Sequence, residues 1–142
     1  MKVRIILAFL VFFLASACKK NSNNNPVPIV PTDITIDINL PSYNALTGVS
    51  GWAYVNGGSK GIIVFRRATD EFIAFDRHSP ADPEGTCARP LTPDVDNFLT
   101  LVDSCNNATF SLYDGSAISN SEFGLRIFQT TWNGTGSLRI FN

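Results

Sequence analysis

Apolar and polar side chains alternate with a period of two along several short segments, and this pattern restricts the fold more than any other feature. In the range 32–40 every second residue from Ile34 to Leu40 is apolar, and the residues between them are polar or acidic. Such alternation places apolar side chains on one face of a β-strand and polar ones on the other. The range 32–40 is therefore predicted to form a half-buried strand.

Further segments rich in β-branched and aromatic residues predict more strands. They lie at 52–55, 61–67, 71–76, 98–102, 109–113, 124–132 and 137–141. Asn133-Gly134 predicts a two-residue hairpin turn of the primed type before the last strand. No segment after residue 31 shows a 3.6-residue apolar period over a helical length. We therefore expect residues 32–142 to form an all-β domain, a sandwich or small barrel of stacked antiparallel sheets.

The first 17 residues have a different composition, typical of a secretory signal peptide. Lys2 and Arg4 precede an unbroken apolar run over residues 5–14, which is shorter than the roughly 20 residues that span a bilayer. Ala15-Ser16-Ala17 then offers small residues at a cleavage position, directly before Cys18.

This arrangement resembles a bacterial lipoprotein signal, in which the first mature residue is a cysteine that carries the lipid. Ala15 stands where that family usually has leucine, and Leu14 lies one position earlier. The resemblance implies lipidation of Cys18 and a cell-envelope location in a Gram-negative-type bacterium, at the outer membrane or the periplasmic face. The alternative is ordinary soluble secretion, with Cys18 as an incidental thiol.

Residues 18–31 predict a flexible tether, because they are rich in Asn and Pro and have no periodicity. Removal of Lys2 and Arg4 with the signal peptide would leave nine basic side chains against 12 acidic ones. A net negative chain without a basic cluster is a poor ligand for phosphates, so no nucleic acid partner is expected. The membrane, through the lipid, is the expected partner.

Two polar loops interrupt the strand pattern and hold the chemically reactive side chains of the domain. The first follows the strand at 71–76 and contains His78, which is the single histidine of the chain, and Cys87. The second follows the strand at 98–102 and contains Cys105. Loops that leave a β scaffold are common positions for functional residues.

The order of these segments resembles a Rieske domain over Gly61–Asn142. The resemblance is carried by GIIVFRR and EFIAFDR before the first loop, by Cys105 and Phe110-Ser111-Leu112 around the second, by Asp114-Gly115 and by the final hairpin. It implies a Rieske-like fold and, in an intact member, a [2Fe–2S] cluster held by two Cys and two His.

The ligand positions of that family are mostly replaced in this chain. The resemblance places the C-x-H motif on His78-Ser79-Pro80 and the C-x-x-H motif on Cys105 to Ala108. Pro80 and Ala108 have no side-chain donor atom, so neither can hold iron. His78 and Cys105 are the residual metal candidates. The expected cofactor is therefore none, with a [2Fe–2S] cluster as the alternative.

Cysteine count and the same resemblance favour a disulfide between the two loops. If Cys18 carries lipid, Cys87 and Cys105 are the two thiols left in an oxidising compartment. Rieske proteins of respiratory complexes have a disulfide between their cluster loops, and the resemblance implies a similar bridge. Free or metal-bound thiols are the alternative.

These observations predict a lipid-anchored protein with a Rieske-like fold that has lost its iron–sulfur cluster and acts as a binding or structural module. Its protein or small-ligand partner is not specified by the sequence. The alternative is a [2Fe–2S] electron-transfer protein or ferredoxin-like component. An enzyme is the less favoured class, at most an oxidoreductase component, because 142 residues leave no room for a second catalytic domain.

Overall fold

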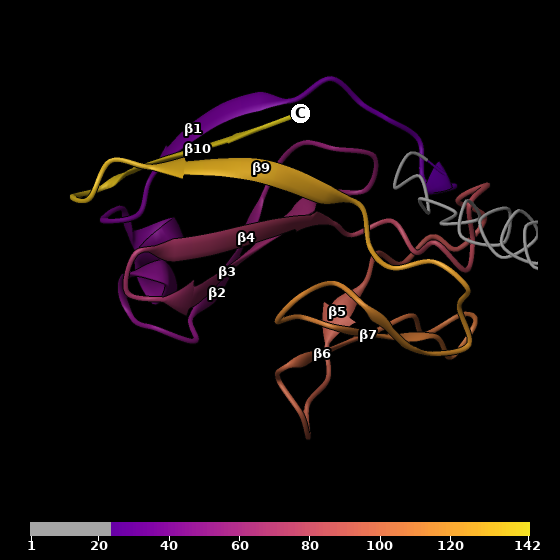
Figure 1. Cartoon of the computed structure of the whole chain (residues 1–142). Helices are drawn as coiled ribbons and strands as arrows, with labels where there is room; N and C mark the ends of the chain where they lie inside the picture. Colours follow the sequence, from indigo (N-terminus) through magenta and orange to yellow (C-terminus); the bar gives the residue numbers. More distant parts are fainter. Residues whose placement is uncertain (1–23) are drawn as a thin grey trace, which may run out of the picture.

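Residues 24–142 are described by a computed structural model, in which ten β-strands and a 3-10 helix follow one another (Figure 1). The elements are β1 (Asp33–Asp37), η3 (Pro41–Thr47), β2 (Trp52–Val55), β3 (Ile62–Ala68), β4 (Glu71–Asp76), β5 (Thr92–Pro93), β6 (Thr100–Val102), β7 (Thr109–Ser111), β8 (Ala117–Ser119), β9 (Ile127–Trp132) and β10 (Ser137–Phe141). No helix in this part of the chain has the length and hydropathy to cross a bilayer.

The strands form two antiparallel sheets, which confirms the predicted all-β class. The larger sheet has six strands in the order β1-β10-β9-β4-β3-β2, and the smaller has four in the order β5-β6-β7-β8. The smaller sheet lies between β4 and β9 in sequence, and Figure 1 shows it below the larger one. All strand pairs within the sheets are antiparallel.

Strand β3 belongs to both hydrophobic clusters because the larger sheet is covered on both faces. Ile62 and Val64 point into a first cluster with residues of β1, β9 and β10. Ile63 and Phe65 point to the opposite face, into a second cluster with apolar side chains of the smaller sheet. Alternate residues of a strand point to opposite faces, so burial on both faces explains the unbroken apolar run at 62–65.

The strand predicted over residues 32–40 ends at Asp37, and the 3-10 helix Pro41–Thr47 was not anticipated. The Asp37 carboxylate accepts hydrogen bonds from the backbone and side-chain nitrogens of Asn39 at 2.9 and 3.0 Å. This turn takes the chain out of the sheet, so Leu40 is 51% exposed instead of facing the core. Strands β5 and β8 were also missed, because segments of two and three residues carry almost no periodic signal.

The turn between β9 and β10 is longer than the two-residue primed turn predicted from Asn133-Gly134. Trp132 pairs with Leu138, which leaves five residues outside the paired register. The Asn133 side-chain oxygen accepts hydrogen bonds from the backbone N–H groups of Thr135, Gly136 and Ser137 at 2.9–3.0 Å. The asparagine therefore acts through its side chain and stabilises a wider loop.

The N-terminal segment 25–31 lies on the folded domain, which differs from the flexible tether expected through residue 31. Asn25 Nδ2 donates a hydrogen bond to the Gly124 carbonyl oxygen at 2.8 Å. Arg126 Nε donates to the Val27 carbonyl oxygen at 2.9 Å, and the Val27 side chain is 1% exposed. The predicted signal peptide, Cys18 and the earlier part of the expected tether lie outside the described residues.

Candidate functional site

The two polar loops predicted as the site lie together and are covalently joined. One loop runs from β4 to β5 and the other from β6 to β7. A disulfide connects Cys87 of the first to Cys105 of the second, with their Cα atoms 6.0 Å apart. The predicted pairing of these two cysteines is confirmed. Cys87 is buried and Cys105 lies on the exposed side of the bridge.

His78 is buried, and both of its ring nitrogens contact the protein itself. Nε2 lies 2.9 Å from the carbonyl oxygen of Asp82, and Nδ1 lies 2.7 Å from the hydroxyl oxygen of Ser59. A carbonyl oxygen accepts only, so Nε2 carries a proton in this arrangement. The imidazole therefore links its own loop to the turn after β2, and its donor atoms point to protein partners.

The buried carboxylate of Asp82 holds the same loop together through hydrogen bonds. It accepts hydrogen bonds from the backbone N–H groups of Thr86 and Cys87 at 3.1 and 2.8 Å. Lys60 Nζ lies 3.9 Å from the carboxylate and donates to the Gly85 carbonyl oxygen at 3.0 Å. Burial raises the pKa of Asp82, but the hydrogen bonds and the lysine charge outweigh this effect and leave its pKa below the ordinary value.

Asp103 has the corresponding role in the second loop. Its carboxylate accepts hydrogen bonds from the backbone N–H groups of Cys105 and Asn106 at 2.9 and 3.1 Å. Burial raises the pKa of Asp103, whereas hydrogen bonds from Ser79, Asn106 and Cys105 together lower it below the ordinary value.

The four positions that match the Rieske ligand motifs do not form a ligand set. Cys105 Sγ is bonded to Cys87, and the His78 ring contacts Ser59 and Asp82. Pro80 and Ala108 are buried, and Ala108 packs in the second hydrophobic cluster. A [2Fe–2S] cluster needs two thiolates and two imidazoles. The residues present therefore do not fit that cluster.

The residual metal candidates also lack a common site. The sulfurs of Cys87 and Cys105 and a carboxylate oxygen of Asp103 lie within 4.8 Å of one another. Both sulfurs belong to the disulfide, however, and the thiolate is the form of cysteine that binds metals. His78 directs its nitrogens to Ser59 and Asp82, so it does not join Cys105 at a metal position.

A buried acidic residue next to these loops was missed from the sequence. Asp76, at the end of β4, is fully buried and accepts hydrogen bonds from the backbone N–H groups of Ser59, Lys60 and His78. It therefore aligns the turn after β2 with the start of the first loop. The signal in the sequence for the burial of Asp76 was weak. Asp76 ends an apolar strand, and an Asn-Gly-Gly-Ser turn lies elsewhere in the chain.

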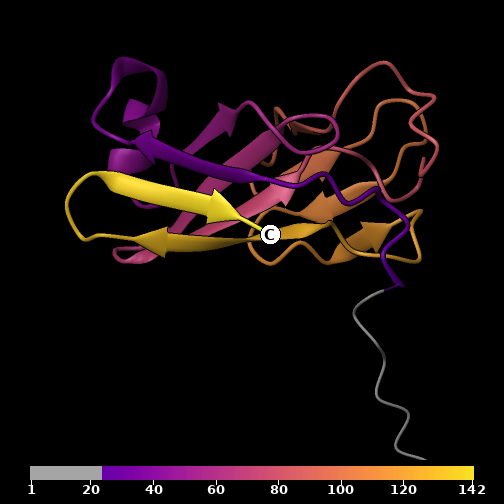
Figure 2. The same cartoon turned by 90° about the horizontal axis from the view of Figure 1, so that it is seen from above.

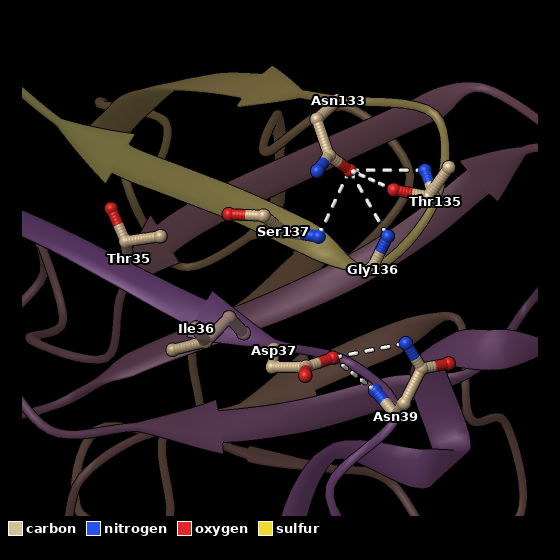
Figure 3. A pocket seen from close by; sticks show the side chains of 8 residues that line it. All are labelled: Thr35, Ile36, Asp37, Asn39, Asn133, Thr135, Gly136 and Ser137. Atoms are coloured by element: carbon tan, nitrogen blue, oxygen red, sulfur yellow. Dashed lines mark hydrogen bonds between the residues drawn. The ribbon is translucent and has the colours of Figure 1, made fainter.

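A separate polar hollow of about 490 Å³ lies at the β9–β10 turn, away from the disulfide loops (Figure 3). Its lining residues are Thr35, Ile36, Asp37, Asn39, Asn133, Thr135, Gly136 and Ser137. Figure 3 shows the Asn133 and Asp37 side chains engaged in hydrogen bonds with their own loops. A second hollow of about 410 Å³ lies beside Pro80 of the first loop and Phe123.

Comparisons of the chain with protein-family models, with curated proteins and with solved structures found no match. The resemblance to the Rieske family accordingly rests on the residues and the order of segments quoted above.

Proposed function

We propose that this chain is a lipid-anchored cell-envelope protein whose Rieske-like domain has lost its iron–sulfur cluster and acts as a binding or structural module. The observation that carries the proposal is the chemistry at the former ligand positions. Proline and alanine occupy two of them, a disulfide sulfur the third, and the fourth is a histidine whose ring nitrogens both face protein partners.

The disulfide and the buried network perform the structural task that a cluster performs in an intact domain. A cluster joins two loops through its ligands, and here the bond between Cys87 and Cys105 joins them. Asp82 and Asp103 each hold a loop by hydrogen bonds to backbone N–H groups. This supports a domain in which the loop pair is preserved as a surface while the redox chemistry is absent.

Metal and sulfide analysis of the purified protein tests the cluster part of the proposal. Protein from iron-replete cells should contain no stoichiometric iron or acid-labile sulfide and should show no visible absorption. A brown preparation with an EPR signal after reduction would contradict the proposal and support the electron-transfer alternative.

The membrane part needs a separate test. The full-length chain expressed in a Gram-negative host should sediment with the cell envelope, and Cys18→Ser should release it into the soluble periplasmic fraction. Mass spectrometry of the mature N-terminus supplies a direct readout, because the lipid adds a defined mass to the first residue. Envelope attachment that survives Cys18→Ser would contradict lipidation.

A further inference from the structure

We infer that the anchor end of the domain, defined here as Pro80–Ala81 and Asn120–Gly124, faces the lipid surface. The opposite end, the hairpin end, is defined as Asn133–Ser137 and faces away from it. This inference rests on the proposed lipid at Cys18. It adds which surface of the domain meets the membrane, and its partner is the headgroup layer of a bilayer.

The first step is the attachment of the N-terminal segment to the anchor end. Asn25 donates a hydrogen bond from Nδ2 to the Gly124 carbonyl oxygen at 2.8 Å. Arg126 Nη2 donates to the Asn25 carbonyl oxygen at 3.1 Å, and its Nε donates to that of Val27. The buried Val27 side chain adds an apolar contact. The start of the described chain is therefore held at Asn25, next to Gly124.

The second step is the short distance in sequence from Asn25 to the proposed lipid. Cys18 lies only seven positions before Asn25. Seven residues in any conformation span at most about 25 Å. A domain of about 120 residues has a radius of gyration of about 14 Å, and hence a diameter of about 35 Å. The connection is shorter than the domain is wide, so the domain cannot turn freely above the membrane.

The third step is the distance between the two ends. Strand β9 begins directly after Arg126 and reaches the hairpin end after Trp132. At about 3.3 Å per residue, this strand separates the ends by about 20 Å. Figure 2 agrees, because the indigo start of the coloured ribbon lies on one side of the domain and the β9–β10 turn lies on the other.

The surface at the anchor end suits headgroups better than hydrocarbon. The hollow there is lined by Pro80, Ala81 and Phe123 together with the polar residues Asn120, Ser121 and Glu122. Amide, hydroxyl and carboxylate groups lose hydration when they enter hydrocarbon, so this end rests at the headgroup layer without insertion. The hollow at the hairpin end then opens toward the aqueous phase.

Site-specific labelling of the full-length protein in phosphatidylcholine vesicles tests the orientation. Glu122→Cys and Thr135→Cys introduce a thiol at the exposed surface of the anchor end and the hairpin end, respectively. Cys87 and Cys105 are paired and the proposed lipid blocks Cys18, so the new thiol is the one that a fluorophore labels. Nitroxide on lipid headgroups, a short-range quencher, should quench the Glu122→Cys label several-fold more than the Thr135→Cys label.

Vesicle flotation, measured on the same samples, separates the two proposals. Protein that does not float overturns the lipid anchor and with it the orientation. Protein that floats but shows equal quenching at both labels overturns the orientation alone.

Two further variants test the cause of the orientation. A 12-residue Gly/Ser insertion between Asn23 and Asn24 should bring the quenching at the two labels closer together, because it lengthens the connection without touching the domain. Arg126→Gln should act in the same direction, because it removes hydrogen bonds that hold Asn25 and Val27 on the domain. Unchanged quenching after the insertion would overturn the inference that the short connection sets the orientation.

Discussion

Arg126 binds Val27 across 99 positions of sequence, with its Nε donating a hydrogen bond to the Val27 carbonyl oxygen at 2.9 Å. Its Nη2 also donates to the Asn25 carbonyl oxygen at 3.1 Å. One side chain directly before β9 thus satisfies two backbone acceptors of a segment outside the sheets. This contact makes the N-terminal segment part of the folded domain.

Arg126→Ala should lower the free energy of unfolding by about 1–3 kcal/mol, because hydrogen bonds from a charged donor to partly buried acceptors are lost. Urea unfolding monitored by tryptophan fluorescence measures this change. Arg89→Ala is the control, since Arg89 is exposed, and it should change stability by less than about 0.5 kcal/mol. Equal effects of the two substitutions would contradict the anchoring role of Arg126.

Reduction of the disulfide should lower the melting temperature by about 10 °C or more. Cys87 and Cys105 are 18 positions apart, and closing a loop of this size stabilises a domain by about 3 kcal/mol. Calorimetry with and without a phosphine reductant measures the shift. The double variant Cys87→Ser, Cys105→Ser should melt at the lower temperature under both conditions. A melting temperature of the unaltered protein that does not respond to reductant would contradict this prediction.

His78→Ala should destabilise the domain by about 2–4 kcal/mol, because it removes two hydrogen bonds and leaves a cavity. Ser59→Ala should cost about 1 kcal/mol. The double variant should lose less than the sum of the two single losses, since the residues share one hydrogen bond. Chemical unfolding of all four proteins gives the coupling energy. Strict additivity would show that the contact between His78 and Ser59 contributes nothing.

The fold class and the disulfide could be predicted from the sequence. The strand patterns lie within short segments, and the disulfide follows from the number of cysteines. Alternation identified the segment that became β1, β-branched and aromatic content identified those that became β2, β3, β4 and β10, and the number of cysteines favoured one bridge. The Val27–Arg126 contact gave no such signal, because an Asn- and Pro-rich segment has the composition of a tether whether or not it is bound. The burial of Asp76 depends on backbone N–H groups from a distant turn, which no pattern along the chain reports.

Acid should destabilise the protein below about pH 4, partly through Asp82 and Asp103. The pKa of each carboxyl lies below its ordinary value in the folded protein. A lowered folded-state pKa means that the stabilisation is present above the unfolded pKa, about 3.9, and is lost as pH falls through the folded value. The free energy of unfolding measured from pH 6 to pH 2 should therefore fall less steeply in Asp103→Asn. A slope for Asp103→Asn equal to that of the unaltered protein would contradict the role of Asp103.

Gly115 and Gly134 both have a positive φ, +77° and +85°, but their surroundings differ. A Cβ atom at Gly115 would lie 2.5 Å from Phe75 Cε1, whereas one at Gly134 would have no neighbour within 4 Å. Phe75 is fully buried, so its ring has no free space into which to move. Gly134→Ala should therefore lower the free energy of unfolding by about 1 kcal/mol, because only the left-handed backbone conformation is strained. Gly115→Ala should cost about 1–3 kcal/mol more, because overpacking of the second hydrophobic cluster adds to the same strain. Urea unfolding of the two variants compares them directly, and equal losses would mean that Phe75 yields to the added methyl group.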